Sequence, residues 1–280
     1  MNYFKTAILL LTLTILLVWI GGLVGGQHGA LVAFIFAMVL NFVSFWYSDK
    51  IVLAMYKAEE LPEKEYPEVY SIVRNLAEVA NMPVPKIYVA PKEVPNAFAT
   101  GRSPEKGVVC LTRGILKLLS HEELRGVIAH EMAHIKNRDT LIMTVAAALA
   151  SAVMMLAYMA RWAAMFGGLG GRDSRDRSGG AIGLFAVAIL APLAATLIQL
   201  AISRSREYAA DRHGAQFARS GQGLANALRK LHNAASHYRL GATPQTAHLF
   251  IVNPLSGEFL TGLFMTHPPV EKRIEILQSL

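Results

Sequence analysis

Charged side chains are almost absent from the N-terminal part of this 280-residue chain. After Lys5, no Asp, Glu, Lys or Arg occurs before Asp49. Over the whole chain, 17% of the residues are charged and 53% are hydrophobic, and the mean hydropathy is +0.36. This composition excludes an ordinary soluble domain and indicates a membrane protein.

Cysteine is also scarce, because Cys110 is the only one in the sequence. A single cysteine excludes an internal disulfide and fits a reducing compartment. Cys110 lies in the apolar run 107–111, which predicts a buried thiol on a strand rather than a nucleophile. The net charge of +7 is spread along the chain without a basic helix or an aromatic-interleaved basic patch, so we expect no nucleic-acid partner. An anionic membrane surface is the expected partner of Arg204, Arg206 and Arg212.

The uncharged N-terminal stretch is interrupted by glycines, which divide it into two apolar segments. We predict two transmembrane helices, Thr6 to Gly26 and Gly29 to Tyr47, each close to the roughly 20 residues that a span needs. A cleaved signal peptide is disfavoured because the second segment follows at once. Lys5 before the pair and Lys50 and Lys57 after it place both outer ends in the cytoplasm by the positive-inside rule.

Two more apolar segments, 140–160 and 181–203, predict a second helical hairpin. The loop between them carries more basic than acidic residues, contrary to the positive-inside rule for an external loop. These basic residues are Arg161, Arg172, Arg175 and Arg177. Whether this second hairpin fully crosses the bilayer or is partly embedded in protein stays open.

A soluble segment, 48–139, precedes the second hairpin and predicts a small α+β unit. We expect a helix at 66–80 and three strands, at 86–90, 97–101 and 108–112. One of these strands includes Asn96, Ala97, Phe98 and Ala99 and fits an edge strand that binds an extended substrate peptide through its backbone. An ordinary strand inside the sheet fits the same residues equally well.

The last part of this segment reads His-Glu-Met-Ala-His and is expected to be helical. Ser120 and Glu123 form a capping box at the start of that helix. His130 and His134 are four residues apart and therefore share one helix face, where two imidazoles can bind one metal ion. Glu131 lies about 100° round the helix, where its carboxylate can hold the attacking water and take its proton.

A catalytic zinc site takes three protein ligands, so a third must lie elsewhere. The metzincin pattern is excluded because Asn137 and Thr140 stand where it requires Gly and His. No His, Asp or Glu occurs in 140–160, which makes Glu207 the first strong candidate. Asp211 follows four residues later and can accept a hydrogen bond from a ligating histidine. A solvated helix face with paired charges is the alternative interpretation of this segment.

No Pro or Gly separates the metal helix from the third apolar segment, so we expect one helix to run directly into it. Beyond Glu207 we expect helices at 216–219 and 224–237, and a last short helix that starts at Pro269. His267, just before that start, could reach over the metal and donate to the oxyanion, with Arg273 assisting. The spacing fits a solvated pair as well.

With these motifs the chain resembles the HtpX family of integral-membrane zinc endopeptidases, which is distantly similar to the CaaX prenyl proteases. The resemblance covers nearly the whole chain. It rests on the paired N-terminal spans, an apolar hairpin and four motifs: N-A-F-A-T-G, H-E-M-A-H-I-K-N-R-D, S-R-E-Y-A-A-D and the terminal H-P-P-x-x-x-R. It implies His130, His134 and Glu207 as ligands of one Zn²⁺ ion, Glu131 as the base, and His267 with Arg273 near the oxyanion.

The expected fold is therefore a mainly α membrane protein with a small α+β, zincin-like domain built around the metal helix. We divide the chain into a transmembrane hairpin (1–47), an α+β segment (48–139), a second apolar hairpin (140–203) and a C-terminal helical part of the catalytic domain (204–280). The resemblance implies cleavage of misfolded membrane proteins under stress, in the inner or plasma membrane of a bacterium, with the site facing the cytoplasm. A CaaX-type processing peptidase and a non-catalytic membrane scaffold or transporter are the alternatives.

Overall fold

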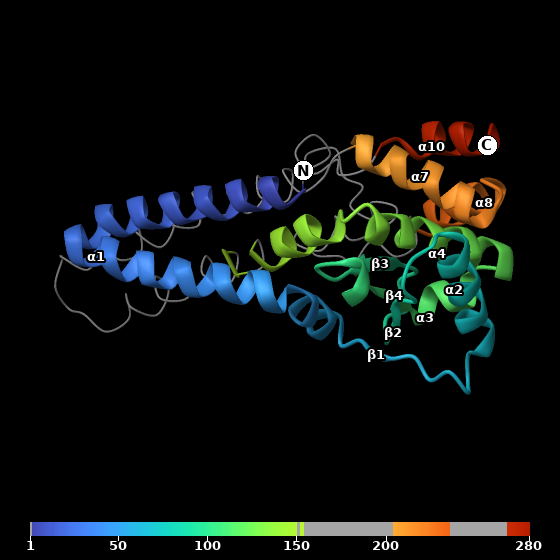
Figure 1. Ribbon diagram of the computed structural model, residues 1–280, viewed down its shortest axis with the longest axis horizontal. Helices are drawn as coiled ribbons and strands as arrows, with labels where there is room; N and C mark the ends of the chain where they lie inside the picture. Colours follow the sequence, from blue (N-terminus) through green and yellow to red (C-terminus); the bar gives the residue numbers. More distant parts are fainter. Residues whose placement is uncertain (1, 150–151, 154–203, 236–267) are drawn as a thin grey trace, which may run out of the picture.

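The computed structural model describes residues 2–149, 152–153, 204–235 and 268–280. Figure 1 shows a long helical arm, α1, that extends away from a sheet and the remaining labelled helices. The elements are α1 (Asn2–Tyr56), β1 (Glu59–Glu60), α2 (Pro67–Val79), β2 (Lys86–Ala90), β3 (Ala97–Thr100), η1 (Pro104–Lys106), β4 (Val108–Thr112), α3 (Arg113–Leu118), α4 (His121–Lys136), α7 (Arg204–Ala218), α8 (Gln222–Ala235) and α10 (Val270–Gln278).

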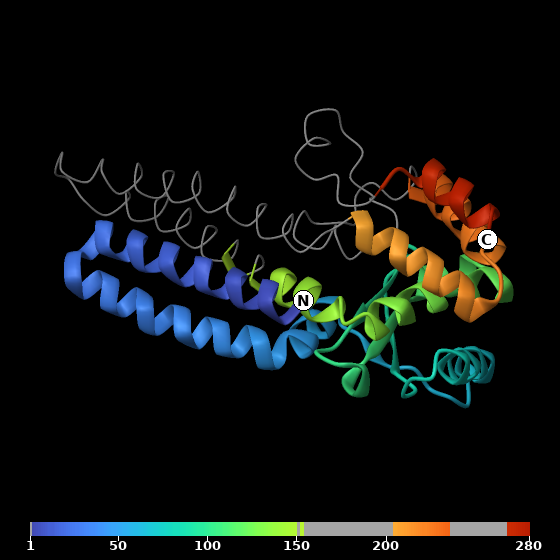
Figure 2. The ribbon, with the colours of Figure 1, turned by 45° about the horizontal axis from the view of Figure 1, so that its top comes forward.

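The long element α1 folds back on itself, and its two arms lie side by side in Figures 1 and 2. Gly26 has a φ of 58°, a left-handed conformation that glycine adopts without steric cost. The arms touch through glycine backbone, because a Cβ on Gly29 would lie 2.2 Å from the carbonyl oxygen of Gly21. Further along, Nδ2 of Asn41 donates to Oγ1 of Thr14 at 2.7 Å. Small residues and one polar pair therefore join the arms.

The second arm is longer than its sequence suggested. It continues to Tyr56, beyond the predicted end at Tyr47, because the polar residues 48–50 and the apolar run 51–56, which packs on the sheet, form helix as well. By length and composition, one helix of the described residues, Gly26–Tyr56, could cross a membrane. Thr6–Trp19 and Thr140–Leu149 are shorter apolar helices.

The four-stranded sheet has the order β1-β2-β4-β3, so β3 lies at an edge. Strands β2 and β4 run parallel, whereas β3 pairs with β4 antiparallel and β1 with β2 antiparallel. The three predicted strands are present within one residue of their expected ends. The two-residue strand β1 and the short helix α3 were not predicted.

Both faces of the sheet are covered, which follows from the alternation of side chains along β4. Val109 and Leu111 belong to the core shared with α2 and α4. Val108 and Cys110 point to the other face, where the end of α1 packs against Phe98. Cys110 is fully buried, as predicted for a strand thiol, and burial raises the pKa of this thiol.

The helix α4 does not continue straight into the next apolar segment, so the predicted single helix is wrong. It ends at Lys136, and Arg138 adopts a φ of 59°. The N–H of Arg138 donates to the Ile135 carbonyl, and the N–H of Asp139 donates to the His134 carbonyl. This is the Schellman arrangement, here with arginine at the position that glycine usually occupies, and the break was not predicted because no glycine marks it.

On the C-terminal side, α7 includes residues 216–218 of the separate helix predicted at 216–219 and ends before Arg219. It packs closely on α4 because Gly214 has no side chain: a Cβ there would lie 2.9 Å from the backbone nitrogen of His130. Elements α7, α8 and α10 together share the hydrophobic core with α4. Residues far apart in the sequence are thereby brought to one face of α4.

Candidate metal centre

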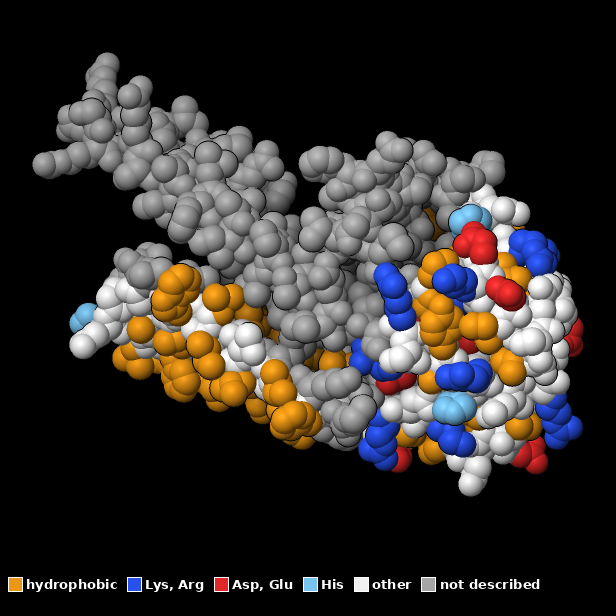
Figure 3. All heavy atoms as spheres, turned by 90° about the horizontal axis from the view of Figure 1, so that it is seen from above, with side chains coloured by type: hydrophobic (Ala, Val, Ile, Leu, Met, Phe, Trp, Pro, Cys, Tyr) orange, Lys and Arg blue, Asp and Glu red, His pale blue; other side chains and the backbone are white. Residues whose placement is uncertain are grey.

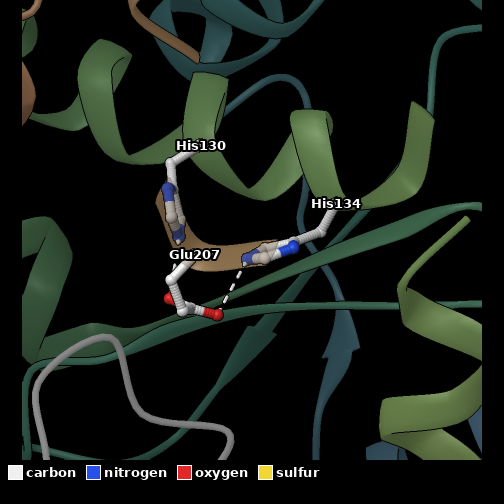
Figure 4. Close-up of side chains that lie close together, drawn as sticks. All are labelled: His130, His134 and Glu207. Atoms are coloured by element: carbon white, nitrogen blue, oxygen red, sulfur yellow. Dashed lines mark ion pairs between the residues drawn. The ribbon is translucent and has the colours of Figure 1, made fainter. Parts of the chain in front are cut away.

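Three buried side chains meet between α4 and α7. His130 and His134 extend from α4, and Glu207 from α7 faces both of them (Figure 4). One ligand atom from each lies within 4.8 Å of the others. Nε2 of His130 is 3.7 Å from Oε2 of Glu207, and Nε2 of His134 is 3.5 Å from Oε1. Ligand atoms around a tetrahedral zinc ion are roughly 3.3 Å apart, so small side-chain adjustments would let these three atoms hold one ion.

The start of α4 is fixed by the predicted capping box. The backbone N–H of Ser120 donates to Oε2 of Glu123 at 2.8 Å, and the Ser120 hydroxyl accepts from the Glu123 N–H. Lys230 of α8 lies 2.8 Å from the same carboxylate oxygen. Burial acts to raise the pKa of Glu123, but the bonds from Lys230 and Ser120 outweigh it and lower that pKa. The helix that carries both histidines therefore begins at a defined residue.

His130 is held by a carboxylate from α7. Its Nδ1 lies 3.0 Å from Oδ1 of Asp211, although the ring N–H does not point squarely at that oxygen. Arg273 of α10 binds the same carboxylate through two donors, Nε to Oδ2 at 2.8 Å and Nη2 to Oδ1 at 2.7 Å. Burial acts to raise the pKa of Asp211, but Arg273 outweighs it and lowers that pKa to about 2. Asp211 thus stays ionised and can orient His130.

His134 has a carboxylate partner of its own. Nδ1 of His134 lies 3.3 Å from Oδ2 of Asp139, the residue that ends the turn after α4. Nε of Arg206 lies 3.9 Å from the other oxygen of Asp139. Arg206, which the sequence assigned to an anionic membrane surface, is instead nearly buried, because α7 turns this side chain toward Asp139. Each histidine is therefore paired through one nitrogen and leaves Nε2 for a metal ion.

Glu131 is buried beside the two histidines. The backbone N–H of Ala99, on β3, donates to its carboxylate. Burial raises the pKa of Glu131 to about 7. A carboxyl group with this pKa can take up and release a proton near neutral pH.

The surroundings of the three candidate ligands, His130, His134 and Glu207, favour a cation. Burial alone would lower the pKa of His134, but Asp139, Glu207 and Glu131 together raise it to about 9. Burial does lower the pKa of His130, which favours the neutral, ligating form of that imidazole. Carboxylates outnumber guanidinium groups among these buried residues, so their charge favours a cation at this position, either a protonated His134 or a bound divalent metal ion.

The edge strand β3 lies next to Glu131. The N–H of Thr112 donates to the Asn96 carbonyl, which makes Asn96 and Thr112 a hydrogen-bonded pair of the ladder. By the alternation of an antiparallel ladder, Ala97 and Ala99 direct their N–H and C=O groups away from β4, whereas Phe98 bonds to it. Two backbone units of β3 therefore face the side on which Glu131 lies.

Two residues, His267 and Arg273, were predicted to lie near the oxyanion. His267 lies outside the described residues. Arg273 is fully buried and its guanidinium binds Asp211, with Nη2 also 3.5 Å from Nε2 of His130. Its predicted place beside an oxyanion stays a prediction.

The sequence interpretation missed Asp139 and Arg206 as neighbours of the site. Asp139 had a signal: a ligating histidine usually donates to a carboxylate, and Asp139 is the acid that directly follows the motif. Arg206 had none, because only the packing of α7 on α4 directs it inward.

Comparison with known proteins adds a family and a fold. The family described as peptidase family M48 matches residues 63–280. The protease HtpX homolog of Syntrophobacter fumaroxidans is 55% identical over 278 residues, which cover 99% of this chain and 99% of that protein. The protease HtpX homolog of Thermococcus kodakarensis is 52% identical over 279 residues, covering 99% and 96%. The crystal structure of S. mikatae Ste24p is similar in fold, with a TM-score of 0.54 and 17% identity, and the match covers 99% of this chain and 66% of that one.

Proposed function

The chain belongs to peptidase family M48 and, within it, to the HtpX proteases, and from this premise we propose that it is a zinc-dependent endopeptidase acting on unfolded membrane proteins. Its being a metalloprotease follows from the family. What we propose beyond the family is that the metal is zinc, that the substrates are unfolded membrane proteins, and that parts of the chain lie in the membrane. The observation that carries it is the group of three buried donor side chains beside a buried Glu131.

His130, His134 and Glu207 would hold one zinc ion, since two imidazoles and one carboxylate are a donor set that catalytic zinc uses. When bound, zinc supplies a Lewis acid that polarises the scissile carbonyl and makes water acidic enough to lose a proton near neutral pH. Asp211 and Asp139 hold the rings of the two histidines. The ligands would thus need little rearrangement on binding.

Glu131 is the proposed base. Its carboxylate takes a proton from the attacking water and passes it to the nitrogen of the leaving amine. The N–H of Ala99 holds this carboxylate beside β3. A substrate in extended form would pair with the backbone of Ala97 on the same edge, which brings its peptide bond close to Glu131. His267 is proposed to donate to the oxyanion from the C-terminal side.

The membrane placement is supported by the apolar surface of α1. Figure 3 shows hydrophobic side chains over the arms of α1 in this view, whereas Lys, Arg, Asp and Glu gather over the other part of the molecule. We propose that 1–47 and 140–203 lie in the membrane, with the parts 48–139 and 204–280 forming the catalytic unit on its cytoplasmic side. The end of α1 beyond Tyr47 would then emerge with the catalytic unit.

Cleavage by the purified chain tests this function. The full chain, loaded with zinc, is given an unfolded membrane protein, and in parallel a prenylated C-terminal peptide. We expect cleavage of the unfolded protein, and we expect Glu131→Gln to retain zinc but lose about 10² to 10⁴ in rate. Glu122→Gln on the exposed side of the same helix is the matched control and should cleave normally. Cleavage of the prenylated peptide alone would replace this proposal with a CaaX-type processing role.

A further inference from the structure

Arg102 lies where the catalytic unit touches α1. It follows Gly101 directly after the edge strand β3, and its guanidinium carbon lies 4.4 Å from the ring centroid of Trp46 on α1. The hydroxyl of Thr140 donates to the Gly101 carbonyl at 2.7 Å and holds the preceding backbone. Arg102 is therefore a positioned side chain, half-buried against an aromatic ring.

The N–H donors of the Arg102 guanidinium have no acceptor among the described residues. Across the described ranges of the chain, its contact is the face of Trp46, and neither a carboxylate nor a hydrogen-bond acceptor accompanies it. A guanidinium carries five N–H donors in one plane, so stacking one face on an aromatic ring leaves its edge available. A half-buried cation of this kind calls for an anionic partner.

The residues of α1 around Trp46 indicate the depth in the bilayer at which this partner would lie. Phe42, Trp46 and Tyr47 are 59%, 48% and 46% exposed, and the charged residues of the second arm of α1 begin just after them, at Asp49. Aromatic residues at the end of an apolar helix mark the headgroup level of a bilayer. Lys50 is four residues after Trp46 and so shares its helix face, with Nζ 5.5 Å from the ring centroid of Tyr47. A second cation therefore stands on the same level.

We propose that Arg102, stacked on Trp46 and accompanied by Lys50, binds the phosphate of an anionic phospholipid headgroup. The planar donors of arginine match a phosphate in bidentate fashion, and the ammonium of lysine adds charge without a fixed direction. The apolar surface of α1 below this level would take the acyl chains. The proposal rests on the proposed membrane placement of α1 and is independent of the metal centre.

Lipid binding to the full chain in a neutral detergent provides the test. The probes are fluorescent phosphatidylglycerol and fluorescent phosphatidylcholine, titrated against wild type and variants. We expect wild type to prefer phosphatidylglycerol, and Arg102→Ala to bind it about tenfold more weakly, the loss expected for charge-assisted hydrogen bonds. Phosphatidylcholine binding should not change. The affinity of Arg102→Lys for phosphatidylglycerol should lie between those of wild type and Arg102→Ala.

Arg229→Ala is the matched control, because Arg229 is an exposed arginine of α8, and this helix lies away from the two arms of α1 in Figures 1 and 2. It should bind phosphatidylglycerol as wild type does. Equal loss in both arginine variants, or no loss in Arg102→Ala, would overturn the site. Displacement of the lipid by inorganic phosphate alone at similar concentration would overturn the lipid as its ligand.

Folding and catalysis are checked on the same preparations. Arg102→Ala should keep the zinc content and the unfolding midpoint of wild type, and if it does not, Trp46→Leu replaces it as the probe of the stacked site. Trp46→Leu should also weaken phosphatidylglycerol binding, because the guanidinium loses the ring that positions it. An unchanged affinity in that variant would contradict the proposal. Since binding is measured without cleavage, a chain that bound no zinc would leave this result intact.

Discussion

The metal centre and α1 place their charged and apolar side chains in opposite ways. Around the metal centre, charged side chains are inside: Glu131 is 5% exposed, and Asp211 and Arg273 are fully buried. Along α1, apolar side chains are outside, with Val32 at 67% and Phe42 at 59% exposed. Buried charges persist only with partners, and exposed apolar surface persists only where the surroundings are apolar as well. The metal centre supplies its own partners, whereas α1 would depend on surrounding lipid under the proposed membrane placement.

The largest expected effect concerns the buried charged residues of the metal centre. Glu207→Ala removes a proposed ligand, so we expect zinc to be lost and cleavage to fall to background. Asp211→Ala should instead weaken zinc binding by about 10 to 100-fold, because it removes only the partner that orients His130. Metal content and cleavage measured on the same samples separate the two. Normal zinc content in Glu207→Ala would place the third ligand elsewhere.

A second prediction concerns the ion pair between Arg273 and Asp211. Arg273→Met leaves a buried carboxylate without its counterion and should lower the free energy of unfolding by about 3–5 kcal/mol. The double variant with Asp211→Leu should recover much of this loss, since no unpaired charge remains. Unfolding midpoints of the single and double variants test this. Simple additivity of the two single losses would contradict the explanation.

A matched pair of valines compares the two surfaces directly. Val39 on α1 and Val84 before β2 are 57% and 54% exposed. Val39→Lys should cost about 2.5–3.5 kcal/mol if α1 faces lipid. Val84→Lys should stay within about 0.5 kcal/mol, as is usual at a surface in water. The membrane-integrated fraction and the unfolding midpoint are the measurements. Equally small effects of the two substitutions would contradict the placement of α1 in the bilayer.

The smallest predicted effect tests the polar contact inside α1. Asn41→Leu removes the bond to Thr14 but also removes the Asn41 Oδ1 atom, which is buried without a hydrogen-bond partner among the residues described. We expect a loss of only about 0.6 kcal/mol, the average for a hydrogen bond between membrane helices. A chemical-denaturation series in detergent would measure it. A loss as large as that of Arg273→Met would mean that the arms depend on this contact.

Most of what the sequence could predict was local; the grouping of Glu207 with His130 and His134 is the exception, and it followed from the number of ligands that catalytic zinc needs and from the resemblance. The capping box, the four-residue spacing of the histidines and the alternating strand residues depend on near neighbours, and the structure has these elements where they were expected. The break after α4 was missed because Arg138 takes a conformation that glycine normally signals. The pairing of Arg273 with Asp211 depends on how α10 packs against α7, which spacing alone does not determine.

The order of the proposed metal-site residues along the chain would also determine when the enzyme can become active during synthesis. His130, Glu131 and His134 are made early, but Glu207 follows only after residues 137–203, and Arg273 lies almost at the C-terminus. A nascent chain that has just completed α4 has the proposed base and two of the proposed ligands, without the third proposed ligand or the guanidinium that pairs with Asp211. Synthesis of the second apolar hairpin, 140–203, therefore precedes assembly of the proposed site, and by this proposal a chain that ends before Glu207 would not cleave.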